Sequence, residues 1–208
     1  MMEKCTREQN IKRIINMEDR VAKCNRCPSL TRCSRRPSLG KGDLEPQLLM
    51  VFEYDNQFTT NKDEIIRLRD MIKKHLMTER VYYTFMARCQ PKACAIRQNA
   101  NCYMSNKLID KDYSCLLSNL HCEGIPVKPS VDTLMNCLPF LMEEIEILHP
   151  DHVVLFGNRV GDYVQKSCGI FEKAEVNNAF QYEGSHYMIS VEETHFTVDS
   201  AIALSALI

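Results

Sequence analysis

Two short apolar segments constrain the fold of this chain most. Residues 48–53 read LLMVFE and residues 152–156 read HVVLF, so apolar side chains follow one another instead of alternating with polar ones. Such strands are buried on both faces, which is typical of a parallel sheet covered by helices. Helical periodicity and capping signals predict helices over 6–22, 62–76, 131–148, about 159–167 and 200–207. Further strands are expected over 80–86 and 181–191.

This alternation predicts the α/β class, as a three-layer sandwich with a short, mostly parallel central sheet flanked by helices. We expect one domain over residues 1–208, with an ordered loop at 24–46 and a Cys-rich insertion at about 92–130. Ligands of such sheets bind at the carboxyl ends of the strands. The loops after Glu53, Met86 and Phe156 would therefore line the site.

Composition narrows the setting of the protein. No apolar run approaches the roughly 20 residues that a membrane span needs, and the charged N-terminus does not resemble a secretory signal. We therefore expect a cytoplasmic protein without a membrane partner, and a monomer. The net charge of −1 gives no global attraction to nucleic acid. Residues 21–42, however, contain basic and no acidic side chains. Either this loop is simply solvated, or it contacts the DNA backbone through Arg32, Arg35, Arg36 and Lys41.

Cysteine is unusually frequent, with 11 in 208 residues. In a reducing compartment, clustered thiols are better explained as metal ligands than as disulfides. Cys24 and Cys27 form a C-x2-C pair, which by itself fits zinc, iron–sulfur or redox chemistry. Cys89 directly follows an expected strand, and Cys137 lies in the first half of an expected helix. Both positions can hold a ligand rigidly.

Five motifs in order resemble the iron–sulfur uracil-DNA glycosylases. They are CNRCPSL at 24–30, LMVFE at 49–53, RCQP at 88–91, CLPFL at 137–141 and VVLFG at 153–157. The resemblance implies a [4Fe–4S] cluster on Cys24, Cys27, Cys89 and Cys137. It also implies DNA as the partner and hydrolysis of the N-glycosidic bond of a flipped-out base as the activity.

The insertion departs from that family, because Cys89 and Cys137 stand 48 positions apart (137 − 89) instead of close together. It adds Cys94, Cys102, Cys115 and Cys122, with His121 beside the last. These residues either bind a second metal, zinc, or remain free thiols. Cys5, Cys33 and Cys168 are interpreted as structural, although Cys33 is near enough to the pair to replace a ligand.

The resemblance also implies an active site. Glu53 falls on the glutamate of the family's Gly-Glu-Ala-Pro-Gly motif, while bulkier residues replace the rest of that motif. Tyr54, Asn56 and Phe58 are the expected substrate contacts in this loop, with an aromatic ring for stacking. Phe85 takes the place of the base-reading Asn, and an apolar ring there cannot select uracil by paired hydrogen bonds.

A second catalytic candidate lies near the C-terminus, where Thr194-His195-Phe196 partly resembles the family's His-Pro-Ser element. His195 would stabilise the departing base or contact phosphate. Two functions remain open. The chain is a glycosylase-like enzyme for a damaged or modified base, or a catalytically inactive module with an iron–sulfur cluster that binds DNA or a protein. A zinc module without iron is a third reading.

Overall fold

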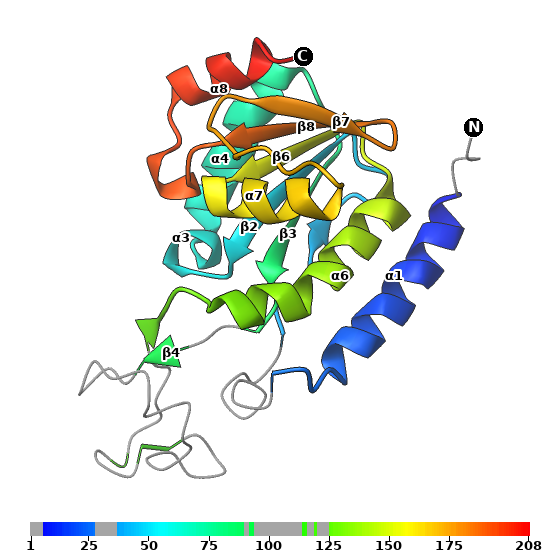
Figure 1. Ribbon diagram of the computed structural model, residues 1–208, viewed down its shortest axis with the longest axis vertical. Helices are drawn as coiled ribbons and strands as arrows, with labels where there is room; N and C mark the ends of the chain where they lie inside the picture. Colours follow the sequence, from blue (N-terminus) through cyan, green and yellow to red (C-terminus); the bar gives the residue numbers. More distant parts are fainter. Residues whose placement is uncertain (1–5, 28–36, 90–91, 94–113, 116–118, 120–124) are drawn as a thin grey trace.

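The computed structural model describes residues 6–27, 37–89, 92–93, 114–115, 119 and 125–208 (Figure 1). The helices are α1 (Arg7–Ala22), α3 (Gln57–Thr60), α4 (Lys62–Leu76), α6 (Val131–Leu148), α7 (Asn158–Ser167), α8 (Val198–Ser205) and the 3-10 turn η1 (Glu193–His195). The strands are β1 (Lys41–Gly42), β2 (Leu48–Tyr54), β3 (Val81–Ala87), β4 (Lys92–Ala93), β5 (Ile125–Pro126), β6 (His152–Phe156), β7 (Ala179–Tyr182) and β8 (Ser185–Ser190).

The described residues form a six-stranded sheet in the order β1-β3-β2-β6-β8-β7. The four central strands are parallel, and β1 and β7 pair antiparallel at the two edges. β2 lies in the middle and is buried along its length, as its continuous apolar run predicts. The expected mostly parallel sheet is confirmed.

Helices cover both faces of this sheet (Figure 1). On one face α1, α6 and α7 contribute to a core that includes Met17, Leu134 and Val160. On the other face α4 and α8 pack over a core that includes Ile72 and Leu204. Successive β2 residues alternate between the two cores, so the strand is the shared centre of the three layers. The expected α/β sandwich is therefore present.

Local signals explain where several elements begin and turn. Thr6 and Gln9 form a reciprocal capping box at the start of α1. Glu183 and Gly184 join β7 to β8 with φ values of 49° and 87°, the left-handed pair that a two-residue hairpin turn needs. The short elements α3, β1, β4, β5 and η1 were not predicted, because a few residues carry too little periodicity.

The expected insertion at about 92–130 lies mostly outside the described residues. Its described ends form the antiparallel pair β4 and β5, which joins Lys92–Ala93 to Ile125–Pro126. Among the described helices, none has the length and apolar character that crossing a membrane requires.

Candidate functional site

A cavity of about 100 Å³ lies at the carboxyl ends of β2 and β6. Its described lining consists of Glu53, Tyr54, Asn56, Lys128, Phe156, Glu192, Glu193 and Thr194. Three of these were expected site residues, and they come from the end of β2 and the loop after it. The cavity thus lies where ligands of parallel sheets bind, at the carboxyl ends of the strands.

Glu53 is held by two cations. Its Oε1 accepts a hydrogen bond from Arg159 Nη1 at 2.5 Å, and its Oε2 lies 3.5 Å from Lys128 Nζ. Arg159 also donates through Nη2 to the carbonyl of Pro129 at 3.0 Å. The carboxylate is therefore fixed in orientation at the end of β2. The sequence analysis did not identify Arg159 as a site residue. Its position in the first turn of the helix that follows β6 was the feature that could have indicated this role.

Lys128 bridges two carboxylates, since its Nζ also lies 3.4 Å from Glu192 Oε1. Partial burial lowers the pKa of Lys128, but Glu53 and Glu192 outweigh that effect, and the pKa is raised above its ordinary value. The amine therefore stays a cation at neutral pH and is unsuited to act as a nucleophile.

Asn56 has two roles in the cavity wall. Its Oδ1 accepts hydrogen bonds from the backbone N–H groups of Phe58 and Thr59, which caps α3. Its Nδ2 donates to Glu193 Oε1 at 2.5 Å. Glu193 is only 7% exposed, and burial raises the pKa of its carboxyl group above the ordinary value. The amide of Asn56 is thus already committed inside the protein.

Aromatic rings form the layer beneath the cavity. Phe156 lines the cavity and stacks on Phe52, with ring centroids 4.8 Å apart. Phe85, an expected substrate contact, is buried in the core against Phe52, and the cavity's described lining does not include it. Phe58 is half-buried against the same core. Along β3 the side chain of Phe85 faces the α4 layer, which explains its place in the core instead of the cavity.

The remaining expected site residues lie at the rim. Tyr54 lines the cavity, and burial followed by the nearby Glu53 raises the pKa of its phenol. His195 is exposed in η1, next to the lining residue Thr194, and its Nδ1 is 3.4 Å from Thr194 Oγ1. His195 is not part of the described cavity wall, so Glu53 and His195 do not share one enclosed pocket.

The four cysteines expected to bind a cluster come together on the α1 and α6 side of the molecule. Cys89 and Cys137 are buried, and Cys24 and Cys27 are half-buried. Burial, together with the neighbouring thiols of Cys137, Cys27 and Cys24, raises the pKa of Cys89 to about 12. The other three thiols therefore lie near enough to Cys89 to act on it electrostatically.

The C-x2-C loop is docked onto α6 by reciprocal contacts. Arg26 donates to the carbonyl of Asn136 at 3.1 Å, and Asn136 Nδ2 donates back to the carbonyl of Arg26 at 3.2 Å. The same Nδ2 lies 3.4 Å from Cys27 Sγ, and the Arg26 guanidinium sits 4.8 Å from the ring centre of Phe140. Pro139 interrupts the backbone hydrogen bonds of α6 at this level. The contacts place Cys27 beside the turn that contains Cys137.

A buried charge pair joins the strand that precedes Cys89 to the helix of Cys137. Arg88 and Glu144 are 1% and 0% exposed, and their Nη2 and Oε2 atoms are 2.5 Å apart. Glu144 also accepts hydrogen bonds from the hydroxyls of Tyr82 and Thr84 at 2.8 and 2.5 Å. Hydrogen bonds from the backbone of Arg88 and Cys89 act on the Cys137 thiol and oppose the rise in its pKa that burial causes. Arg88 thus belongs both to the core and to the cysteine group.

As they stand, the described residues contain no group of three or more Cys, His, Asp or Glu side chains close enough to hold a single metal ion. A tetrahedral ion with sulfur ligands at about 2.3 Å needs a compact set. Of the cysteines expected to bind zinc, only Cys115 lies in the described part of the chain, where it is buried. Cys94, Cys102, Cys122 and His121, like Cys5 and Cys33, lie outside the described residues. Cys168 is half-buried against the core, as expected for a structural thiol.

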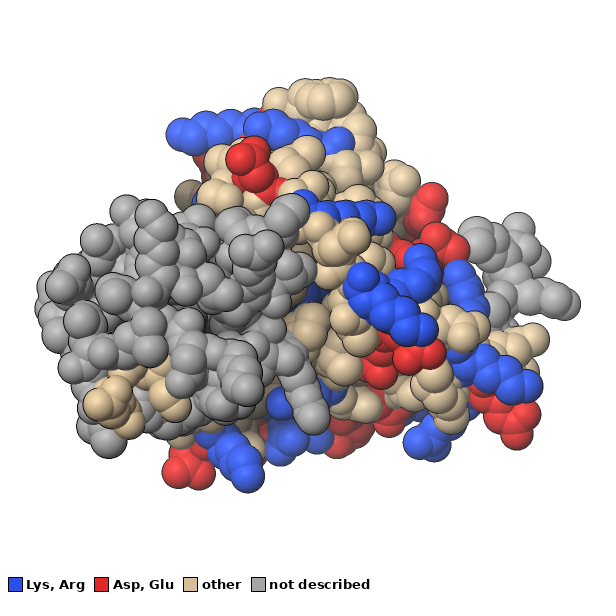
Figure 2. All heavy atoms as spheres, turned by 90° about the horizontal axis from the view of Figure 1, so that it is seen from below, with Lys and Arg blue, Asp and Glu red and all other residues tan. Residues whose placement is uncertain are grey.

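Charge on the described surface is mixed. Lys and Arg side chains are interspersed with Asp and Glu on the face shown in Figure 2. Lys41 is exposed in β1. The other expected DNA-backbone contacts, Arg32, Arg35 and Arg36, lie outside the described residues.

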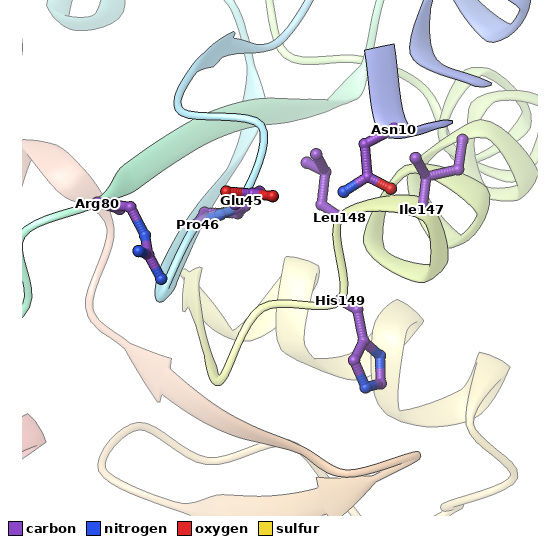
Figure 3. A pocket seen from close by; sticks show the side chains of 7 residues that line it. All are labelled: Asn10, Glu45, Pro46, Arg80, Ile147, Leu148 and His149. Carbon is purple, nitrogen blue, oxygen red and sulfur yellow. The ribbon is translucent and has the colours of Figure 1, made fainter. Parts of the chain in front are cut away.

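A larger cavity of about 250 Å³ lies at the opposite edge of the sheet (Figure 3). Its lining includes Pro46, Arg80 and His149, each of which stands shortly before a strand begins. His149 extends away from Asn10 in this view. The amino ends of parallel strands are not the ligand edge of this type of sheet, so this cavity is not the candidate active site.

Comparison with known proteins identifies the family of the chain. Residues 58–197 match the family model described as the uracil DNA glycosylase superfamily. The matched range includes Cys89, Cys137 and Glu193 but begins after Glu53 and after the C-x2-C pair. No curated protein matches the chain. Because the matched range covers more than half of the 208 residues, this chain belongs to the uracil DNA glycosylase superfamily.

Proposed function

We propose that this protein is a DNA glycosylase of the iron–sulfur type, which removes a damaged or modified base from DNA. The observation that carries the proposal is the position of Glu53. It lies at the carboxyl end of a central parallel strand, lines a cavity together with Phe156, and is oriented by Arg159. A fixed carboxylate beside the sugar is what hydrolysis of an N-glycosidic bond requires.

In the proposed reaction, the target nucleotide leaves the duplex and its base enters the cavity. The bond between the sugar and the base breaks, and positive charge develops on the sugar. Glu53 stabilises that charge and accepts a proton from the attacking water. Arg159 and Lys128 hold the carboxylate of Glu53 in place, which lowers the reorganisation needed during the reaction.

We further propose that Cys24, Cys27, Cys89 and Cys137 bind a [4Fe–4S] cluster. The proposal is supported by the donor set, because the thiols of Cys24, Cys27 and Cys137 act electrostatically on Cys89, and Cys89 and Cys137 are buried. The cluster would join the C-x2-C loop, the end of β3 and α6. Backbone hydrogen bonds at Cys137 would stabilise its thiolate. This role is structural, since the cysteines do not line the cavity of Glu53.

Anaerobic purification tests the cluster. We expect brown protein with about four iron and four sulfide per chain, as a [4Fe–4S] cluster requires. Cys89→Ser should lose colour and iron. Cys168→Ser, which changes a half-buried thiol outside the group, should keep both. Colourless wild-type protein that contains zinc would reject the assignment.

Incubation with oligonucleotides that carry single damaged or modified bases, followed by alkali, tests the activity. Strand breaks are expected with the wild-type protein and not with Glu53→Gln, provided that both contain equal iron. Salt-sensitive DNA binding without any base release would instead favour a non-catalytic DNA-binding module. In that case charge reversal at Arg35 and Arg36 should weaken binding and reduce its salt dependence.

A further inference from the structure

Glu193 is a buried carboxylate without a described countercharge. It is 7% exposed, lines the cavity, and its described side-chain partner is the neutral amide of Asn56. No Lys, Arg or His of the described residues forms an ion pair with it, whereas Glu53 and Glu192 both have cations within 4.0 Å. A buried carboxylate is costly unless a positive charge or several hydrogen bonds compensate it. The described cavity wall therefore lacks a cation opposite Glu193.

Carboxylates are prominent in the described wall. Glu53, Glu192 and Glu193 all line the cavity, and their oxygens accept hydrogen bonds and attract positive charge. The donors of the wall are partly engaged, because one N–H of Asn56 binds Glu193 and Lys128 is held between Glu53 and Glu192. Phe85 lies in the core and offers no polar group.

We propose that the cavity receives a positively charged, N-alkylated base and that Glu193 binds its charge. This inference rests on the proposed glycosylase function and names its substrate class. A single-ring base suits the cavity volume of about 100 Å³, and the aromatic side chain of Phe156 is among the lining residues. Lys128 does not oppose the bound charge strongly, because it is 53% exposed and shared by two carboxylates.

Such a base also matches the chemistry that the site contains. When the glycosidic bond of a cationic base breaks, the electron pair moves to the base, and the base leaves as a neutral molecule. Water then forms the new C–O bond to the sugar, and its proton passes to Glu53. No base anion forms, so no cation is needed at the leaving group.

Binding of two isomeric nucleosides to the iron-loaded protein tests the inference separately from catalysis. The probes are 3-methyl-2′-deoxycytidine, which is cationic at neutral pH, and 5-methyl-2′-deoxycytidine, which is neutral and carries its methyl group on carbon. We expect calorimetry to show about tenfold or greater preference for the cation. Glu193→Gln keeps the acceptor for Asn56 and should abolish the preference. Glu146→Gln, which removes an equal charge on the exposed surface of α6, should not.

The outcomes separate the two proposals. Equal binding of the isomers by the wild-type protein, or an unchanged preference in Glu193→Gln, overturns the inference even if the enzyme releases uracil from DNA. Preferred binding of the cation without base release from any oligonucleotide keeps the inference and rejects the glycosylase activity. Thermal unfolding of each variant shows whether a lost preference reflects a lost fold.

Discussion

Glu144→Gln should destabilise the protein strongly, although it changes few atoms. Glu144 is fully buried and is the one described anion paired with the buried guanidinium of Arg88. Nε and Nη1 of Arg88 have no hydrogen-bond partner among the described residues, so Glu144 provides its main compensation. Removing one partner of a buried pair costs about 3–5 kcal/mol. In a chain of this length, each kcal/mol corresponds to about 2–4 °C, so the melting temperature should fall by about 6–20 °C.

A double-mutant cycle separates the charge from the rest of the network. The amide oxygen that Glu144→Gln introduces still accepts a hydrogen bond from Tyr82 or Thr84, so most of the loss belongs to the uncompensated Arg88. Adding Arg88→Met removes that charge, and the double variant should recover at least about half of the loss. Urea denaturation of proteins with equal iron content measures the free energy of unfolding of all four forms.

The same variant should release iron more readily. Arg88 lies between the end of β3 and α6, and its backbone contributes a hydrogen bond at Cys137. Iron content after gel filtration, compared between wild type and Glu144→Gln, measures the effect. Two results would refute the reasoning about the buried charge. In the first, Glu144→Gln lowers the free energy of unfolding by less than about 1 kcal/mol. In the second, the double variant loses as much unfolding free energy as the two single variants lose together.

Three further changes test other parts of the structure. Asn136→Ala removes the side chain that joins Arg26 to Cys27 and should lower iron retention, measured by iron content, with a loss of about 1–2 kcal/mol in unfolding free energy. Glu193→Gln should stabilise the protein increasingly as pH rises. The raised pKa of Glu193 means that folding favours its protonated form, and this stability is lost above the folded pKa, which melting temperatures across a pH series will detect. Met77→Gly, at the exposed left-handed end of α4, should raise the free energy of unfolding by about 0.5–1 kcal/mol.

The sequence predicted best those helices and strands whose structure follows from the pattern of their own side chains. The apolar runs of β2 and β6 require burial on both faces, and α4 and α6 begin and end at the predicted residues. The proposed cluster ligands Cys24, Cys27, Cys89 and Cys137 were selected from motif order and not from local pattern. The thiols come from three separate parts of the chain, so the resemblance to a family was the only source of that expectation.

The side chains that complete the candidate site could not be predicted in the same way. Arg159, Lys128 and Glu193 reach Glu53 and Asn56 across separations of 106, 75 (128 − 53) and 137 positions. The periodicity of apolar residues in the sequence does not predict such contacts. Each of these three residues lies in a loop or a first helical turn, where polar side chains are common. The buried Glu144 was missed for a related reason, since a glutamate inside an amphipathic pattern suggests a solvent-facing position.

Phe85 shows that the position of a residue in a motif predicts the location of its side chain less well than its position along a strand does. Its alignment with a base-reading residue suggested a place in the cavity. Along β3, however, Tyr82 and Met86 face the α6 layer and Phe85 faces α4, where it completes an aromatic layer with Phe52. That layer is the support on which Phe156 rests under the cavity. In the proposed site, the apolar ring of Phe85 offers no hydrogen bond to uracil, so we expect base selection to depend on the carboxylates of the cavity wall. Among those carboxylates, Glu193 is the one whose charge has no described partner.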